Sequence, residues 1–159
     1  MKNLLKNFNE EDLRIFREEF NDFLPINIID SHVHLWKKDF LDKEISKERQ
    51  KTNPFSDPDI VDGFSFEEFK MVAKKLFPGK KYDGLFFGLP AKEMNISKAN
   101  RYISDICKKN NCYGLYIPEP DLEEIPESFF KDRFVGFKPY PDLVDFEVPE
   151  DFSKLDINV

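Results

Sequence analysis

Both histidines of the 159-residue chain lie in one short stretch, which reads "INIIDSHVHLW" at residues 26–36. Its isoleucines are β-branched and Pro25 precedes it, a pattern that predicts a β-strand. On a regular strand His32 and His34 would lie on the same face, about 6.6 Å apart along the chain. Two imidazoles at this spacing can bind one metal ion, at Zn–N distances of about 2.1 Å. The stretch therefore predicts two ligands of a metal site at the end of a strand.

Asp30 has the same parity as the two histidines, so on a regular strand it would lie beneath them. Val33 would then face the opposite side, toward any covering helices. Metal-bound histidines usually need a hydrogen-bonding partner, and we expect Asp30 to orient an imidazole or a neighbouring loop. The alternative is that the histidines are ordinary surface or hydrogen-bonded core residues. Their place at the carboxyl end of a strand, where parallel α/β folds carry their sites, favours the metal.

Apolar runs that predict strands alternate with periodic segments that predict helices. The strands are expected at 26–36, 82–90, 112–120 and 133–141, and the helices at 9–20, 65–77 and 96–111, with a further helix start at 149–155 and an acidic, partly helical segment at 121–132. The first helix is expected to pack outside the first strand. Residues 36–65 are polar and show no period, which predicts a long loop. This order is typical of parallel βα units in an α/β fold, and it does not distinguish an open sheet from part of a barrel.

Composition excludes several classes of partner. The formal net charge is -7, from 24 basic and 31 acidic residues, so capture of nucleic acid or of an anionic membrane is not expected. The sequence holds no apolar stretch near the ~20 residues that span a bilayer. We therefore expect a cytoplasmic protein that acts on a small molecule. The spacing of Cys107 and Cys112 fits no metal site and predicts two free thiols.

The segment "IDSHVHLW" resembles the first-strand motif of the amidohydrolase superfamily, whose members are metal-dependent (β/α)8 TIM-barrel enzymes. The segment "VGFKPYP" (135–141) is similar to the fourth-strand segment of the branch that includes lactonases and decarboxylases. The resemblance implies that His32 and His34 bind one divalent ion, with Zn²⁺ as the first choice. It also implies a metal-dependent hydrolase that acts on a small ester, lactone or amide.

The same resemblance gives candidate roles to three more residues. Lys138 falls where some members carry a carbamylated lysine that bridges two metals, which makes it the candidate catalytic residue. In the mononuclear branch it would instead pair with a substrate carboxylate. The alternative is that Lys138 has no role at the site and extends its side chain to solvent. Trp36 and Tyr140 follow the two motifs and are expected to bind substrate at the mouth of the site, or else to pack the loop bases. Glu119, at another strand end, is expected to be a solvent-exposed loop carboxylate.

The chain departs from the family in its length. A complete barrel takes about 250 residues and eight strands, and the family's fifth-strand histidine and eighth-strand aspartate have no counterpart here. Residues 1–159 are therefore expected to form the N-terminal (β/α)4 portion of a TIM barrel, inactive alone, which pairs with a C-terminal half or with a second copy. The alternatives are a non-oxidative decarboxylase of the same branch, a metal-dependent phosphoesterase or nuclease, and a non-catalytic fragment.

Overall fold

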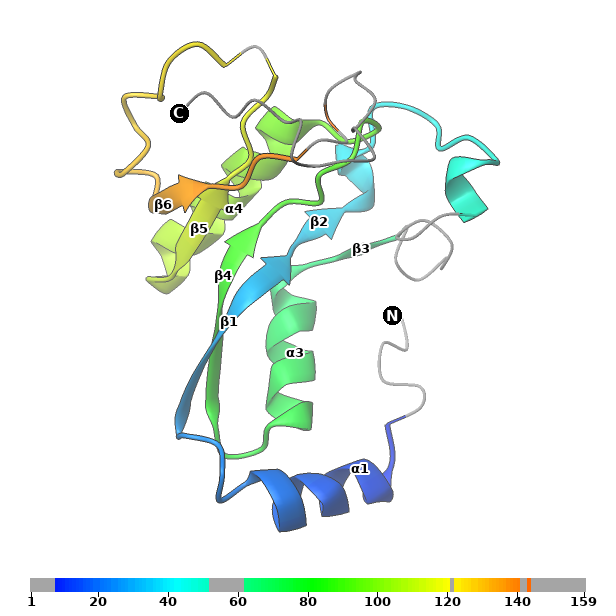
Figure 1. Cartoon of the computed structure of the whole chain (residues 1–159), viewed down its shortest axis with the longest axis vertical. Coiled ribbons are helices and arrows are strands. Elements are labelled where there is room, and N and C mark those ends of the chain that lie inside the picture. Colours follow the sequence, from blue (N-terminus) through cyan, green and yellow to red (C-terminus); the bar gives the residue numbers. More distant parts are fainter. Residues whose placement is uncertain (1–7, 52–61, 121, 141–142, 144–159) are drawn as a thin grey trace, which may run out of the picture.

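A computed structural model describes residues 8–51, 62–120, 122–140 and 143 (Figure 1). Four strands form one sheet: β1 (Asn27–His34), β4 (Lys81–Phe87), β5 (Tyr113–Tyr116) and β6 (Phe134–Phe137). All neighbouring pairs are parallel and the strand order is β1-β4-β5-β6, so each strand lies beside the next one of the sheet along the chain. The predicted parallel α/β arrangement of four strands is confirmed. The helix start expected at 149–155 lies outside the described residues.

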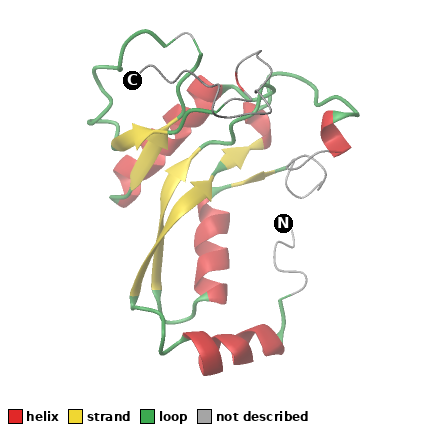
Figure 2. Ribbon diagram, viewed as in Figure 1, coloured by secondary structure: helices red, strands yellow, loops and turns green. Residues whose placement is uncertain are grey.

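Two helices cover one face of this sheet, as Figure 2 shows. They are α3 (Phe66–Leu76) and α4 (Ile96–Asn110). Ser65 caps α3 by accepting a hydrogen bond from the backbone N–H of Glu68, and the Glu68 carboxylate accepts one from the N–H of Ser65. This reciprocal pair satisfies two backbone donors that the first turn leaves open. Asn111 ends α4 in the left-handed conformation, with φ 56°.

The amino-terminal helix occupies a different place from the predicted one. It consists of α1 (Glu10–Ile15) and a π-helical continuation, η1 (Phe16–Phe20). Figure 1 shows it lying across the end of the sheet, below α3, so the expectation that it packs outside the first strand is wrong. Phe16 is its one buried residue, and the ring of Phe16 meets Phe77 just beyond α3 at 6.0 Å. The helix is therefore held by this aromatic contact at the end of α3.

The core lies between the sheet and its two helices, and it includes Val33, Phe66, Phe86 and Ile103. A second apolar cluster sits around the carboxyl end of the sheet, with Phe40, Phe87, Leu89 and Ile117 among its members. The opposite face of the sheet is open over much of its area. There Ile29 is 76% exposed, Val135 53% and Tyr113 49%. Parallel sheets are normally covered on both faces, so this apolar face is unusual for the class.

The expected long loop contains some regular structure. Short strands β2 (Trp36–Lys37) and β3 (Gly63–Phe64) pair antiparallel, and η2 (Lys38–Phe40) and η3 (Arg49–Lys51) are single 3₁₀ turns. Gly63 has φ 108°, and a Cβ there would lie 2.8 Å from the carbonyl oxygen of Trp36, so only glycine fits this pairing. The Arg49 guanidinium contacts both carboxylate oxygens of Glu93, at 3.0 and 3.3 Å, which ties the loop to the segment before α4.

Between β5 and β6 the described residues form turns in place of the predicted partial helix. Phe129, in these turns, is buried and stacks on Phe137 at 4.8 Å. Cys107 and Cys112 are both buried and free, as the sequence predicts. Crossing a bilayer would need a longer and more apolar helix than any in the described part of the chain.

Candidate metal centre

A β-bulge in β1 sets the direction of the two histidines. Asp30 pairs with Gly84 and Val33 pairs with Phe86. Between these two pairs β1 advances by three residues whereas β4 advances by two, which is the register shift of a β-bulge. One carboxylate oxygen of Asp30 accepts a hydrogen bond from the backbone N–H of His32 at 2.9 Å, inside this irregular stretch. A bulge shifts the alternation of side chains by one residue. It therefore places Asp30 and Val33 on the helix-covered face, while the histidines face the other way.

The imidazoles of His32 and His34 converge through their Nε2 atoms, which lie 3.2 Å apart. On its other side, His34 Nδ1 lies 2.8 Å from the carbonyl oxygen of Gly88, just beyond β4. A carbonyl can only accept, so Nδ1 carries the proton and the neutral ring keeps its lone pair on Nε2. This is the tautomer that a metal ion needs when Nε2 is the ligand atom.

Aromatic rings surround the pair. Phe87 lies 4.4 Å from the ring of His34 and 5.0 Å from that of His32, and Tyr140 lies 6.3 Å from His34. Burial among these groups is the main cause that lowers the pKa of His34; the bond to Gly88 opposes it, and the charges of His32 and Lys138 add to it. The lowered pKa favours the neutral form of His34, which is the form that binds a metal.

Asp30 differs from its predicted position. Its second carboxylate oxygen accepts a hydrogen bond from the hydroxyl of Tyr82 at 3.0 Å, and the ring of Tyr82 stacks on Phe77 at 4.5 Å on the α3 side. Burial and the Asp30 carboxylate raise the pKa of Tyr82 to about 12. The expectation that Asp30 lies beneath the imidazoles is wrong, because the bulge reverses its side. Asp30 instead holds the backbone of His32 in the bulge.

Lys138 and Tyr140 lie beside the histidine pair. The backbone N–H of Lys138 donates to the carbonyl of Tyr116 at 2.8 Å, which extends the β5–β6 pairing beyond the strand end. Its Nζ lies 5.6 Å from the ring centre of Phe87 and 5.7 Å from that of Tyr140. The hydroxyl of Tyr140 is buried and has no hydrogen-bond partner among the described residues. The carboxyl ends of β1, β4 and β6 thus bring both motifs of the sequence to one place.

The remaining two candidates lie further out. Trp36 is half-buried and packs beside Phe64 at 6.1 Å, at the base of the β2–β3 pair. Its role in binding substrate stays a prediction. Glu119 is exposed and accepts a hydrogen bond from the hydroxyl of Ser97 at 2.9 Å, which agrees with its reading as a loop carboxylate.

The donor set fits part of a zinc site. Two nitrogens that share a tetrahedral ion at about 2.1 Å would be about 3.4 Å apart, close to the 3.2 Å that separates the Nε2 atoms of His32 and His34. Catalytic zinc takes three protein ligands and a water. Within the described ranges no group of three or more His, Cys, Asp or Glu side chains is placed to hold an ion. Within the described ranges His32 and His34 are thus two candidate ligands, one fewer than a catalytic zinc site takes from protein.

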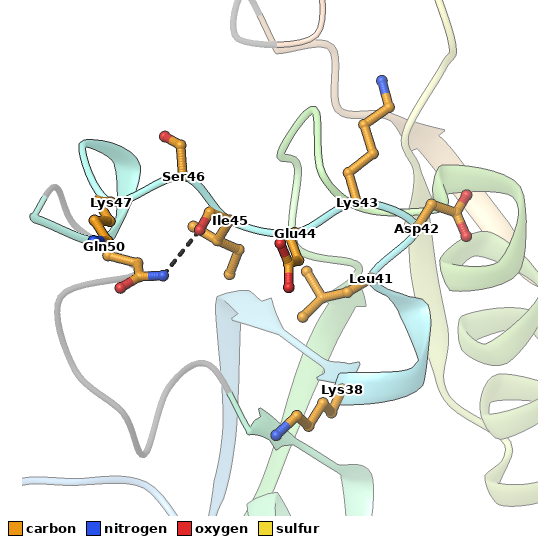
Figure 3. Close-up of a pocket in the computed structure, with 9 residues that line it drawn as sticks. All are labelled: Lys38, Leu41, Asp42, Lys43, Glu44, Ile45, Ser46, Lys47 and Gln50. Carbon is orange, nitrogen blue, oxygen red and sulfur yellow. Dashed lines mark hydrogen bonds between the residues drawn. The ribbon is translucent and has the colours of Figure 1, made fainter.

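Two cavities lie near these elements. One, of 280 Å³, lies between β1 and α3. His32 and His34 are among its lining residues, together with Asp30, Tyr82 and apolar side chains such as Phe69. The other, of 890 Å³, lies along residues 38–50, where Gln50 donates to the carbonyl of Ile45 at 2.9 Å (Figure 3). None of the predicted site residues lines this second cavity, so we treat it as separate from the histidine site.

Phe87 and the carbonyl of Gly88 are the contributors that sequence reasoning missed. Both fall at the end of the apolar run 82–90, next in order after the histidine strand. Since the carboxyl ends of neighbouring parallel strands meet at one edge of a sheet, that position was the available signal. Comparisons with protein-family models, with curated proteins and with solved structures find no match to this chain.

Proposed function

We propose that His32 and His34 hold one divalent metal ion, zinc in the first instance, in a metal-dependent hydrolase of the amidohydrolase type. The observation that carries the proposal is the convergence of their Nε2 atoms to 3.2 Å, with His34 Nδ1 committed to the carbonyl of Gly88. A pair of ordinary surface histidines would need neither feature. The substrate class is a small ester, lactone or amide.

In this proposal the four-stranded sheet is the first half of a (β/α)8 barrel. The strand order β1-β4-β5-β6 and the helices on one face support it. The open face with Ile29 and Val135 would become the barrel interior, and a second set of strands would pair with the outer edges of β1 and β6. That second half, or a second copy of the chain, would supply the further ligands.

Each residue of the site has a role in the proposed reaction. When bound, the metal would activate a water molecule and polarise a substrate carbonyl. Gly88 fixes the tautomer of His34, and Asp30 fixes the backbone that carries His32. In the proposed reaction the ammonium of Lys138 would stabilise negative charge on the substrate, and the hydroxyl of Tyr140 would donate a hydrogen bond.

Non-oxidative decarboxylation is the second candidate. Within the described part of the chain the Lys138 ammonium contacts the rings of Phe87 and Tyr140, and no carboxylate lies within ion-pair distance of it. A cation that lies beside the histidine pair and has no carboxylate partner favours a substrate that carries a carboxylate of its own. Such a substrate is required for decarboxylation and compatible with hydrolysis.

The test uses the tagged protein purified under native conditions and separated by size. Zinc content and hydrolysis of an aryl ester and of a lactone are measured on the 18.9 kDa chain and on any heavier assembly. We expect hydrolysis to follow an assembly that holds zinc, and His34→Ala to abolish it. Ser31→Ala, an exposed neighbour in the bulge, is the matched control. An assembly that holds zinc but turns over neither substrate, and releases no CO₂ from carboxylates, would identify a non-catalytic module.

A further inference from the structure

Cys107 and Cys112 lie at the two ends of the turn that closes α4. The carbonyl of Cys107 accepts hydrogen bonds from the backbone N–H of Asn111 and, at 3.1 Å, from that of Cys112. With Asn111 in the left-handed conformation, this pattern is that of a Schellman motif. The side chains at these two positions of the motif commonly contact each other, because the chain folds back over the last helical turn. The backbone therefore brings the two cysteine side chains together.

Both side chains lie in the core between α4 and the sheet. Cys107 is fully buried, Cys112 is 4% exposed, and both belong to the cluster that contains Phe86 and Ile103. The Sγ of Cys112 lies 4.0 Å from the carbonyl oxygen of Ile106, the residue before Cys107. The thiol of Cys107 donates a hydrogen bond to the sulfur of Cys112. The two sulfurs are thus neighbours, and both are free thiols in this structure.

The two thiols differ in reactivity, because the hydrogen bond between them acts on each in the opposite direction. The bond from Cys107 is the main cause that lowers the pKa of Cys112. Burial and the charge of Asp83 oppose this shift, whereas Arg133, whose Nε donates to the carbonyl of Cys112 at 3.1 Å, adds to it. The same bond, together with burial, raises the pKa of Cys107. The thiolate is the nucleophilic form of cysteine, so Cys112 is the sulfur that reacts first.

We infer that Cys107 and Cys112 form a redox-active thiol pair, which a peroxide converts into one intramolecular disulfide. The Cys112 thiolate attacks an oxygen of hydrogen peroxide, the O–O bond breaks, and Cys112 becomes a sulfenic acid while hydroxide leaves. The sulfur of Cys107 then attacks that of Cys112, so that the S–S bond forms, the S–O bond breaks and water leaves. In total two thiols are oxidised, and the peroxide and the two thiol protons yield two waters.

Burial favours a small oxidant over a bulky one. Neither sulfur offers the surface that a peptide disulfide such as glutathione disulfide needs for attack, whereas hydrogen peroxide is close to water in size. The product joins the last turn of α4 to the start of β5 by a covalent bond. This junction lies at the amino end of β5, away from the carboxyl ends that carry the histidines. The inference therefore stands independently of the proposed function.

The experiment treats the native chain with a small molar excess of hydrogen peroxide, alkylates the remaining thiols in denaturant and maps the tryptic peptides by mass. Lys108 and Lys109 lie between the two cysteines, so trypsin separates them and a disulfide leaves two peptides joined. We expect joined peptides from a chain of monomer mass, and loss of the link after dithiothreitol. Cys107→Ala should stop at a sulfenic acid on Cys112 that dimedone traps. Cys112→Ala should leave Cys107 unmodified over the same time.

Two alkylated, unjoined peptides from the peroxide-treated wild-type chain would overturn the inference. A disulfide found only between two chains would overturn it as well, and intact mass without reductant separates this case from the intramolecular bond. Trapping of Cys107 in place of Cys112 would contradict the order of the two steps. If either alanine variant fails to fold, the peptide map of the wild-type chain still decides, because it needs no substitution.

Glutathione disulfide at the same concentration is the control oxidant. It should join the peptides in the urea-unfolded chain and leave both thiols free in the native chain over the time in which peroxide joins them. Equal reaction of the native chain with both oxidants would contradict selection of the oxidant by burial.

Discussion

His34 Nδ1 lies 2.8 Å from the carbonyl oxygen of Gly88, while its Nε2 lies 3.2 Å from the Nε2 of His32. The contact with Gly88 determines which ring donates in the contact between the two Nε2 atoms. A neutral ring that donates from Nδ1 can only accept at Nε2. In the metal-free protein His32 must then donate the hydrogen between them. A metal ion that binds both Nε2 atoms would displace that hydrogen, and the neutral ring of His32 would then carry its proton on Nδ1.

The tautomers can be read directly by long-range ¹H–¹⁵N NMR of the two rings. We expect His34 to carry its proton on Nδ1 both without and with zinc. His32 should carry its proton on Nε2 without zinc and lose it from that atom when zinc binds. An Nε2-protonated His34 in the zinc-loaded protein would contradict the assignment.

The lowered pKa of His34 gives a pH dependence whose sign can be worked out. The unfolded chain binds a proton near the ordinary value of 6.5, whereas the folded chain binds it only at lower pH because His34 is buried. The stability of the metal-free protein should therefore be complete above pH 6.5 and fall as the pH drops through that value toward the lowered pKa. Urea unfolding at several pH values measures it. His34→Asn should flatten the curve in this window; an unchanged curve would contradict burial as the cause.

Asp30 and Tyr82 should matter for both stability and metal binding. Asp30→Ala leaves the N–H of His32 and the hydroxyl of Tyr82 without their acceptor, at a cost of about 1–3 kcal/mol. It should also weaken zinc binding by roughly 10–100-fold, as loss of a supporting contact does elsewhere. Asp105→Ala, on the exposed side of α4, is the matched control and should change neither.

The pH dependence of stability at alkaline pH tests the same contact between Asp30 and Tyr82, through the hydroxyl of Tyr82. The pKa of Tyr82 is raised from about 10 to about 12, so Tyr82 stabilises the fold fully below pH 10. That contribution should be lost as the pH rises through 12, and Tyr82→Phe should remove this part of the pH dependence. Unfolding midpoints between pH 9 and 12, compared for the two proteins, give the answer. Parallel curves would show that the hydroxyl is not held by Asp30.

Gly88 is expected to tolerate no side chain. A Cβ at Gly88 would lie 2.8 Å from the Cβ of Ala99 in α4, where no rotamer change can relieve the clash. Gly88→Ala should therefore destabilise the protein by roughly 1–3 kcal/mol and move the carbonyl that holds His34. Gly136→Ala is the control, because its nearest neighbour is the flexible end of Leu115 at 3.3 Å. Equal urea midpoints for the two variants would contradict this account.

Local signals predicted much of the fold. The Ser65–Glu68 capping box marks the start of α3 to the residue, and the alternation of apolar runs with helices gives the parallel sheet and its sequential order. These features depend on neighbours within a few positions of the chain, which sequence patterns report well. The pairing of His32 with His34 on one face is of the same kind.

What the sequence did not reveal depends on contacts between distant segments. The bulge in β1 arises from its register against β4, and without it Asp30 would indeed share the face of the histidines. The β2–β3 pair is two residues long on each side, too short for any period to be visible. The contact of His34 with Gly88 joins residues 54 positions apart, and only the folded sheet brings them together.

The central claim is that His32 and His34 together bind one metal ion, and native mass spectrometry of the zinc-treated chain tests it most directly. We expect wild-type protein and Ser31→Ala to carry one zinc per chain, and His32→Ala and His34→Ala each to carry none under the same conditions. The same zinc load on all four proteins, or none on any of them, would contradict the account. In that case the convergence of the two rings would be a packing feature of the sheet and not a metal site.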